Sequence, residues 1–262
     1  MERFSPVQIM VLLAAAFAAG MINSVAGGGT LLTFPALIAL GLDPKVANAT
    51  STVALLPALV GGLFGYRREL AGTRDLFLRL GLASVIGGGI GAWLLIRTPS
   101  QTFAHLVPFL ILFATVLFML QEPINRLVRV GELKPDDEKR GRWWAGAMLF
   151  QFCSAIYGGY FGAGNGILML AALGLLGLTD IHRANGLKNF LGITLNFIAI
   201  LFFAAAGLVD WRIALLMMTG AVAGGYFGAT AARRVGRAIV RRAIVCIGLA
   251  IGVYMLWRTF AG

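Results

Sequence analysis

The feature that most constrains the fold of this sequence is an internal repeat at a constant offset of 137 residues, without gaps. Three motifs carry it: residues 26–31 align with 163–168 (Ala-Gly-x-Gly-x-Leu), 43–48 with 180–185 (Asp-x-x-x-Ala-Asn) and 87–92 with 224–229 (Gly-Gly-x-x-Gly-Ala). Two copies of one apolar unit, each interrupted by glycines, are typical of membrane transporters with internal repeats.

The composition indicates an all-α integral membrane protein. Hydrophobic residues make up 59% of the chain and charged residues 13%, about half of the roughly 25% found in soluble domains. Apolar runs of about 20 residues match the length that crosses about 30 Å of hydrocarbon, and the short alternating segments of a barrel do not occur. We predict helical spans near 46–66, 76–96, 102–121, 185–206, 211–231 and 239–257.

Two further apolar stretches, 7–41 and 143–178, are too long for one span and contain glycine-rich centres. The segment 122–142 is rich in charge and indicates a linker. We therefore predict a first membrane repeat at 1–121, a cytoplasmic charged linker at 122–142 and a second membrane repeat at 143–262. The N-terminus has the pattern of a signal peptide, but the matching segment 143–160 is internal, so we expect it to be retained.

The positive charges predict the topology. If each long stretch crosses the membrane once, the Lys and Arg residues divide 13 to 9 between the two sides; if each folds back at its glycines, they divide 17 to 5. The second arrangement obeys the positive-inside rule far better. It gives two inverted-topology repeats, each a Gly-broken helical hairpin plus three transmembrane helices, with both termini outside and the linker in the cytoplasm of a plasma (inner) membrane.

The two glycine breaks are the candidate site. Glycine lets the backbone leave helical geometry and approach a ligand, and irregular backbone inside a membrane survives only where protein or a polar cavity surrounds it. The free N–H groups at the start of a half-helix favour an anion. The candidate residues of the breaks are Asn23, Ser24, Gly27, Gly28, Gly29 and Thr30 in the first half, and Tyr160, Gly164, Asn165 and Gly166 in the second.

Polar residues also open the helix after each hairpin, where they mark a helix interface or a water-filled cavity. The first set is Asn48, Thr50 and Ser51, and the second is Asn185, Lys188 and Asn189. Lys188 aligns with Ser51, so one half carries a cation where the other carries a hydroxyl. Lys188 either neutralises an anionic substrate or extends to the cytoplasmic interface from a helix end; the sequence favours neither. For the glycines at 87, 88, 91, 224, 225 and 228 we expect close helix packing.

No motif supports catalysis, a metal or a cofactor. A Walker A loop, HExxH, GxSxG and CxxCH are all absent from the sequence, and no carboxylate lies within a predicted span. Asp43 and Asp180 are expected to cap helices. Cys153 and Cys246 are expected to be small packing residues rather than a disulfide or ligands. The net charge of +11 follows from the topology, so nucleic acid is not an expected partner.

The chain resembles the sulfite exporter TauE/SafE family over nearly its whole length. The resemblance rests on Gly20-x3-Ser24-x2-Gly27-Gly28-Gly29 followed by Pro35, then Ala47-x-x-Thr50-Ser51, and the second-half echo Gly159-x-x-Gly162-x-Gly164-x-Gly166. This chain departs from the pattern at Asn165, at Ala172 where a proline would match Pro35, and at Lys188-Asn189. The resemblance implies export or uptake of sulfite or of small organosulfonates such as sulfoacetate.

Together these observations predict a secondary transporter of small sulfur oxyanions, an exporter working by alternating access in the lipid bilayer. Protons as the coupling ion and a homodimer stay open. One alternative is a passive anion channel or facilitator, because no coupling carboxylate is visible. The other is a membrane-embedded enzyme subunit, for which Cys153 is the one thin candidate nucleophile.

Overall fold

The computed structural model describes residues 5–25, 28–66, 70, 74–129, 137–178, 180–235 and 237–260, and this part of the chain is helical without a strand. The first half contains α1 (Pro6–Val25), α2 (Thr30–Ala39), α3 (Pro44–Gly65), α4 (Arg74–Arg97) and α5 (Ser100–Arg129). The second half contains α6 (Asp137–Tyr160), α7 (Asn165–Leu175), α8 (Ile181–Ala205), α9 (Trp211–Val235) and α10 (Arg237–Phe260). The prediction of an all-α membrane protein is confirmed.

Equivalent helices begin at the spacing of the sequence repeat. The starts of α3 and α8, of α4 and α9, and of α5 and α10 are each 137 residues apart. The repeated aspartates explain one pair of starts, because they cap equivalent helices as predicted. Asp43 Oδ1 accepts a hydrogen bond from Lys45 N at 2.9 Å, and Asp180 Oδ1 accepts one from His182 N at 2.9 Å.

Six described helices are long and apolar enough to cross a membrane: α1, α3, α4, α5, α8 and α10. Of the predicted spans, 211–231 is covered by α9, which is a long helix but not among these six. α5 continues past the predicted end at 121 to Arg129, and α6 begins at Asp137. Much of the predicted linker 122–142 is therefore helical backbone, while residues 130–136 lie outside the described part of the chain.

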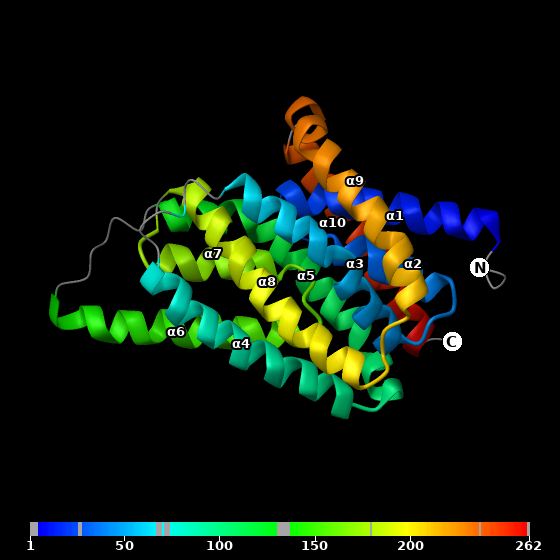
Figure 1. Cartoon of the computed structure of the whole chain (residues 1–262), viewed down its shortest axis with the longest axis horizontal. Helices are drawn as coiled ribbons and strands as arrows, with labels where there is room; N and C mark the ends of the chain where they lie inside the picture. Colours follow the sequence, from blue (N-terminus) through cyan, green and yellow to red (C-terminus); the bar gives the residue numbers. More distant parts are fainter. Residues whose placement is uncertain are drawn as a thin grey trace.

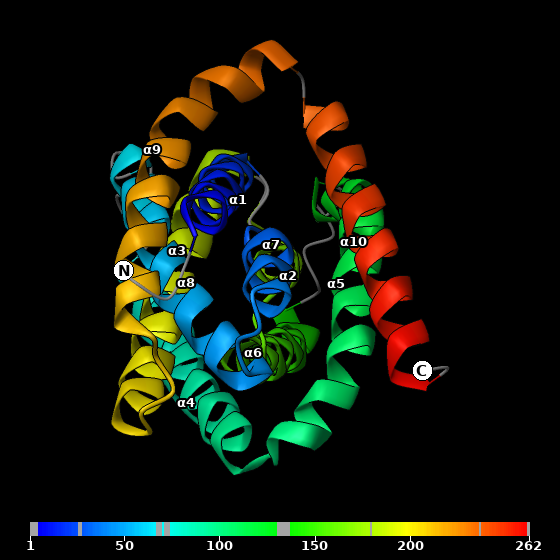
Figure 2. The same ribbon diagram turned by 90° about the vertical axis from the view of Figure 1, so that its right-hand side faces the viewer.

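The helices pack in the same pattern when the two halves are exchanged. α1 packs along α9 and α6 along α4; α3 packs on α9 and α8 on α4; α3 also packs on α8, and α5 on α10. Figure 2 shows the short helices α2 and α7 near the centre, with α4, α5, α9 and α10 at the rim. In Figure 1 both chain ends lie at the right of the view, whereas α6 begins at the left.

Glycines allow the tight contacts along α1–α9 and α4–α6. A Cβ on Gly224 would overlap the carbonyl oxygen of Phe17, and one on Gly91 would overlap the carbonyl oxygen of Ile156. Gly87, Gly88 and Gly225 also face backbone or side chains of a neighbouring helix, so the prediction of close packing is confirmed for these five. Gly228 lies outside the residues whose packing the structure describes.

Candidate functional site

The first glycine break lies between α1 and α2 and is held by a side chain. Asn23 Oδ1 accepts hydrogen bonds from Gly28 N at 2.9 Å and from Gly29 N at 3.1 Å. These N–H groups belong to the entrance of α2, which the helix cannot satisfy by itself. A carboxamide oxygen therefore occupies part of the anion-favouring end of this half-helix. Gly27 and the side chain of Ser24 lie outside the described residues.

The second break lies between α6 and α7 and is built differently. Gly162 and Gly164 have φ values of +81° and +74°, a left-handed conformation that glycine adopts without strain. Tyr157 Oη donates to the Ala163 carbonyl at 2.6 Å, and Ser154 Oγ donates to Asn165 Oδ1 at 2.7 Å. Gly166 N–H, at the start of α7, has no hydrogen-bond partner among the described residues. The start of α7 therefore keeps a free backbone N–H, whereas the N–H groups at the start of α2 are bonded to Asn23 Oδ1.

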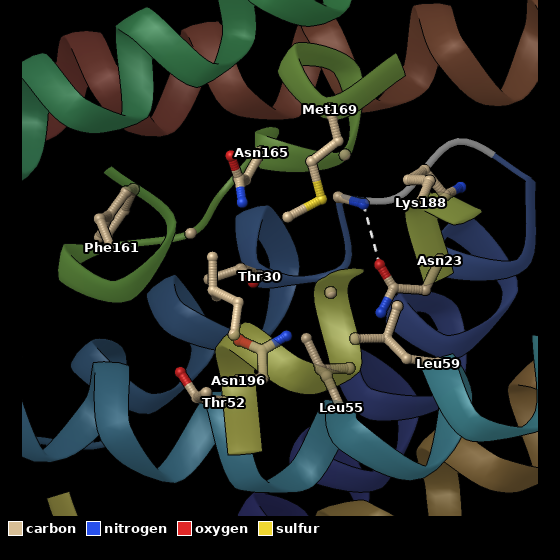
Figure 3. Close-up of a pocket in the computed structure, with 15 residues that line it drawn as sticks. Asn23, Thr30, Thr52, Leu55, Leu59, Phe161, Asn165, Met169, Lys188 and Asn196 are labelled. Atoms are coloured by element: carbon tan, nitrogen blue, oxygen red, sulfur yellow. Dashed lines mark hydrogen bonds between the residues drawn. The ribbon is translucent and has the colours of Figure 1, made fainter. Parts of the chain in front are cut away.

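The two breaks meet at one cavity of about 70 Å³. That volume holds a few water molecules, since about 10–15 Å³ suffices for one, and it is far smaller than the roughly 300–1,000 Å³ of a site for a drug-sized ligand. Figure 3 shows side chains from both halves around it. The lining residues are Asn23, Gly28, Thr30, Thr52, Leu55, Leu59, Phe161, Gly162, Asn165, Gly166, Met169, Lys188, Gly192, Leu195 and Asn196.

Of the predicted site residues, Asn23, Gly28, Thr30, Asn165, Gly166 and Lys188 line this cavity. Four others lie behind the cavity lining and bind protein groups. Asn48 Nδ2 donates to the Tyr160 carbonyl at 3.2 Å, and Ser51 Oγ pairs with Thr33 Oγ1 at 2.6 Å. Thr50 Oγ1 accepts from Asp210 N at 3.0 Å, and Asn185 Oδ1 accepts from Lys188 Nζ at 3.1 Å.

The remaining predicted residues also lie outside the lining. Gly29 is bonded to Asn23, Gly164 packs against Ala114, and Tyr160 Oη donates to Thr98 Oγ1 at 3.3 Å. Asn189 is buried against Gly62, whose added Cβ would lie 2.6 Å from Asn189 Nδ2. The structure therefore brings six predicted residues together and leaves these others as their supports.

Two polar lining residues, Thr52 and Asn196, were not among the predicted site residues. Thr52 follows the Asn48–Ser51 cluster directly, and Asn196 lies two turns after Lys188 on α8, so the helix period of 3.6 residues could have indicated both. The apolar part of the lining, Leu55, Leu59, Met169 and Leu195 among others, carries no sequence signal that separates it from ordinary core residues.

Lys188 is the only ionisable residue among the lining residues that the structure describes. Its side chain is 4% exposed, and its Nζ donates to Asn185 Oδ1 at 3.1 Å. The helices that line the cavity, α1, α2, α3, α7 and α8, contain no Asp or Glu. A buried charge without a counter-ion is costly, so this cavity favours an anion strongly over a cation.

One aromatic ring lines the cavity, and further rings pack behind it. Phe161, which lines it, packs edge to face on Phe34 with ring centroids 5.3 Å apart, and Phe103 packs on Tyr160 at 5.6 Å. Phe103 belongs to the first turn of α5, and Lys45 Nζ donates at 2.9 Å to the carbonyl of Thr98 between α4 and α5. The aromatic layer therefore lies at the end of the molecule where α4 ends and α5 begins.

We looked next for residues that could bind a metal ion or act as a catalytic nucleophile. Among the described residues no group of three His, Cys, Asp or Glu side chains could hold a metal ion. Cys153 and Cys246 are exposed on α6 and α10, so the expectation that they pack inside the protein is wrong. Both helices turn part of their surface away from the core, and these cysteines lie on that part.

Comparison with known proteins decides the family. The family model described as sulfite exporter TauE/SafE matches residues 12–255. This chain belongs to the TauE/SafE family. It is 28% identical over 251 residues to a probable membrane transporter protein of Haemophilus influenzae, covering 95% of this chain and 94% of the relative. It is 27% identical to the probable membrane transporter protein YfcA of Escherichia coli K12, covering 97% of this chain and 91% of the relative.

A more distant TauE/SafE relative is the probable membrane transporter protein YunE of Bacillus subtilis, 23% identical over 95% of this chain and 97% of the relative. No solved structure matches the chain significantly. The family and these relatives are membrane transporters, not enzymes. This chain is accordingly a multi-pass membrane transporter.

Proposed function

We propose that this TauE/SafE transporter exports a small sulfur oxyanion, either sulfite or an organosulfonate such as sulfoacetate, and that the cavity between the two breaks is its binding site. One observation carries the proposal: a single buried lysine, Lys188, lines a small cavity whose surrounding helices contain no carboxylate. Such a cavity requires a negative partner of small volume.

The donors of the cavity suit a group with several acceptor oxygens. Lys188 Nζ supplies a charge, and the free Gly166 N–H and the carboxamide nitrogens of Asn165 and Asn196 supply neutral donors. Hydrogen bonds to a charged acceptor are roughly twice as strong as neutral ones. The hydroxyls of Thr30 and Thr52 complete the set from the first half. Sulfite and a sulfonate head group both present three oxygens to such donors.

The predicted residues behind the lining position these donors. Asn185 Oδ1 accepts from Lys188 Nζ, and Ser154 Oγ donates to Asn165 Oδ1, which leaves the amide nitrogen of Asn165 as its donor toward the cavity. Asn23 holds the first break closed through Gly28 and Gly29. In this proposal a substrate oxygen meets donors whose orientation is already set by protein hydrogen bonds.

We further propose that the two halves are inverted repeats in the inner plasma membrane and work by alternating access. The exchange symmetry of the helix contacts and the position of the chain ends opposite the start of α6 support this arrangement. It places both termini and the aromatic layer outside and the linker 122–142 in the cytoplasm. The residues equivalent to Phe34, Phe103 and Phe161 in the other half are the smaller Ala171, Val240 and Ser24, so the cytoplasmic side opens more easily, as loading for export requires.

The experiment is sulfite flux from proteoliposomes containing the wild type, Lys188→Met or Asn165→Leu. Loss of one hydrogen bond to a charged group costs about 1.5–3 kcal/mol, so each variant should bind sulfite roughly 10- to 150-fold more weakly. Phe197→Leu, on the exposed surface of α8, is the matched control and should transport normally. If both cavity variants transport sulfite at the wild-type rate, the cavity is not the binding site.

A passive channel is the competing function. Counterflow separates the two, because only a carrier exchanges labelled for unlabelled substrate against its gradient. Saturable flux with counterflow supports the proposal. Flux that rises in proportion to concentration, without counterflow, would favour the channel.

A further inference from the structure

We propose that Lys188 itself carries the coupling proton: its amine is neutral in the empty transporter and takes up one proton together with the anion. The inference rests on the proposed function and assigns its coupling ion to one side chain. The geometry that supports it is the isolation of Lys188, a buried amine with neutral neighbours, in a cavity that admits the substrate.

The neighbours of Lys188 can hydrogen-bond to its amine, but they carry no negative charge that would neutralise its ammonium form. Asn185 Oδ1 accepts from Nζ at 3.1 Å, and Asn23, which lines the same cavity (Figure 3), is also an uncharged carboxamide. With 4% of the side chain exposed, a permanent ammonium here would have little water around it and no counter-ion among the described residues, which is unfavourable. Lysine, unlike arginine, escapes this cost by losing its proton.

The charged and titratable groups on the elements packed against α8 do not replace a counter-ion. α7 carries none, and the break 28–30 carries none. On α3 the one such group is Lys45, which donates to the Ile96 and Thr98 carbonyls. Tyr157 and Tyr160 of α6 donate to Ala163 and Thr98. None of these supplies a negative charge beside Lys188.

The other titratable groups on these elements are not among the residues that line the cavity. On α8 itself they are His182 and Arg183, with Tyr66 stacked beside His182. The remaining groups on the neighbouring elements are Arg74, Asp75, Arg79 and Arg97 of α4, and Asp137, Glu138, Lys139, Arg140, Arg142 and Cys153 of α6. Asp180, the N-cap of α8, accepts from His182 N and Arg183 N, and the side chains of Glu69 and Asp75 lie outside the described part of the chain.

The proposed cycle accounts for the proton at each step. On the loading side the neutral Nζ binds one proton and the substrate accepts a hydrogen bond from the resulting ammonium. On the opposite side the anion leaves, the ammonium again lacks a counter-ion, and Nζ returns its proton to water. One proton and one anion cross together in the same direction, so an imposed pH gradient drives anion movement.

The test uses a substitution that keeps the positive charge at position 188 but removes the ability to gain and lose a proton. Arginine stays protonated, so Lys188→Arg should still bind sulfite while pH-gradient-driven accumulation is lost. The assay follows sulfite and internal pH together in voltage-clamped proteoliposomes, at alkaline pH where sulfite is the dianion. Lys45→Arg, the other lysine buried among the described residues, is the matched control and should keep its response. Asp75→Asn should keep it too.

A chemical version covers the case in which Lys188→Arg does not fold. Lys188→Cys is made in a background where Cys153 and Cys246, both exposed, are alanine, and the new thiol is modified with an aminoethyl or a trimethylammonioethyl thiosulfonate. The titratable aminoethyl group should restore the pH response; the permanently charged group should restore binding alone. Equal pH responses with both reagents, or a full response in Lys188→Arg, would overturn the inference. Absence of sulfite flux in the wild type would overturn the proposed function and this inference with it.

Discussion

Asn23 Oδ1 accepts a hydrogen bond from Gly28 N at 2.9 Å, so a side chain of α1 occupies the entrance of the half-helix α2. The same oxygen accepts from Gly29 N at 3.1 Å. An oxygen held by two backbone donors at a helix start is where an anion would otherwise bind. The two breaks are therefore not equivalent: the second, with its free Gly166 N–H, keeps an open donor at the proposed binding cavity.

Asn23→Asp should abolish sulfite transport, because it places a fixed carboxylate in the lining of the cavity that contains Lys188 and supplies the negative charge that the substrate would bring. We expect sulfite binding to weaken at least tenfold, equivalent to about 1.4 kcal/mol. Asn23→Ser, which keeps an acceptor without charge, should lose less. Binding to purified protein by calorimetry measures the difference. Equal affinities for the two variants would contradict the electrostatic reading of the site.

Gly158→Ala should impair both stability and transport. Its added Cβ would overlap Asn165 Nδ2 and lie 2.8 Å from Leu195 Cδ1, so the Asn165 amide must move. Overpacking of this kind costs about 1–3 kcal/mol. Gly146→Ala, also on α6 but with no atom within 4 Å of the added Cβ, should be neutral or slightly stabilising. Thermal unfolding in detergent, together with flux, compares the pair.

Gly91→Ala should destabilise the protein through helix packing alone. An added Cβ would overlap the Ile156 carbonyl oxygen and lie 2.7 Å from Tyr160 N, which are rigid backbone atoms. Two residues earlier, Gly89 meets its nearest atom at 3.7 Å and should tolerate alanine. We expect a loss of about 1–3 kcal/mol for Gly91→Ala. A similar Tm for the two variants would show that α4 and α6 separate easily.

Cysteine labelling tests the inverted topology. Gly141 and Ser100 are both exposed, at the start of α6 and the start of α5. In a background without Cys153 and Cys246, an impermeant reagent applied outside intact cells should label Ser100→Cys and leave Gly141→Cys unlabelled until the cells are opened. The reverse pattern would show that the protein has the opposite orientation in the membrane. Labelling of both cysteines from outside would exclude the inverted repeat.

The repeat made much of the architecture predictable. Equal spacing of Asp43 and Asp180 predicted two capped helices, and both aspartates accept the expected backbone hydrogen bonds. The packing role of Gly91 and Gly224 was predictable because small residues on apolar helices have few other uses. The ends of the helices were less predictable. α5 runs to Arg129 because the charged residues that follow its apolar run still favour helix.

The candidate site was predictable only in part. Polarity identified Asn165 and Lys188, but Asn48 and Ser51 are equally polar and form hydrogen bonds behind the cavity lining. Which polar residue faces the cavity depends on the rotation of α3 and α8, which packing sets. A bulky residue at Gly28 would overlap the Phe118 ring, so it would disturb folding as well as binding.

The sequence by itself determined that this chain crosses a membrane as two copies of one unit, because apolar length and repeat spacing are local properties of the chain. It also limited the site to the breaks and the helices that follow them. Only the tertiary structure decided that Lys188 is buried beside Asn185, that Asn23 closes one break, and that Phe161 lines the cavity with other aromatic rings packed behind it. These are contacts between residues far apart in sequence or on different helices, and their geometry follows from how the two halves pack.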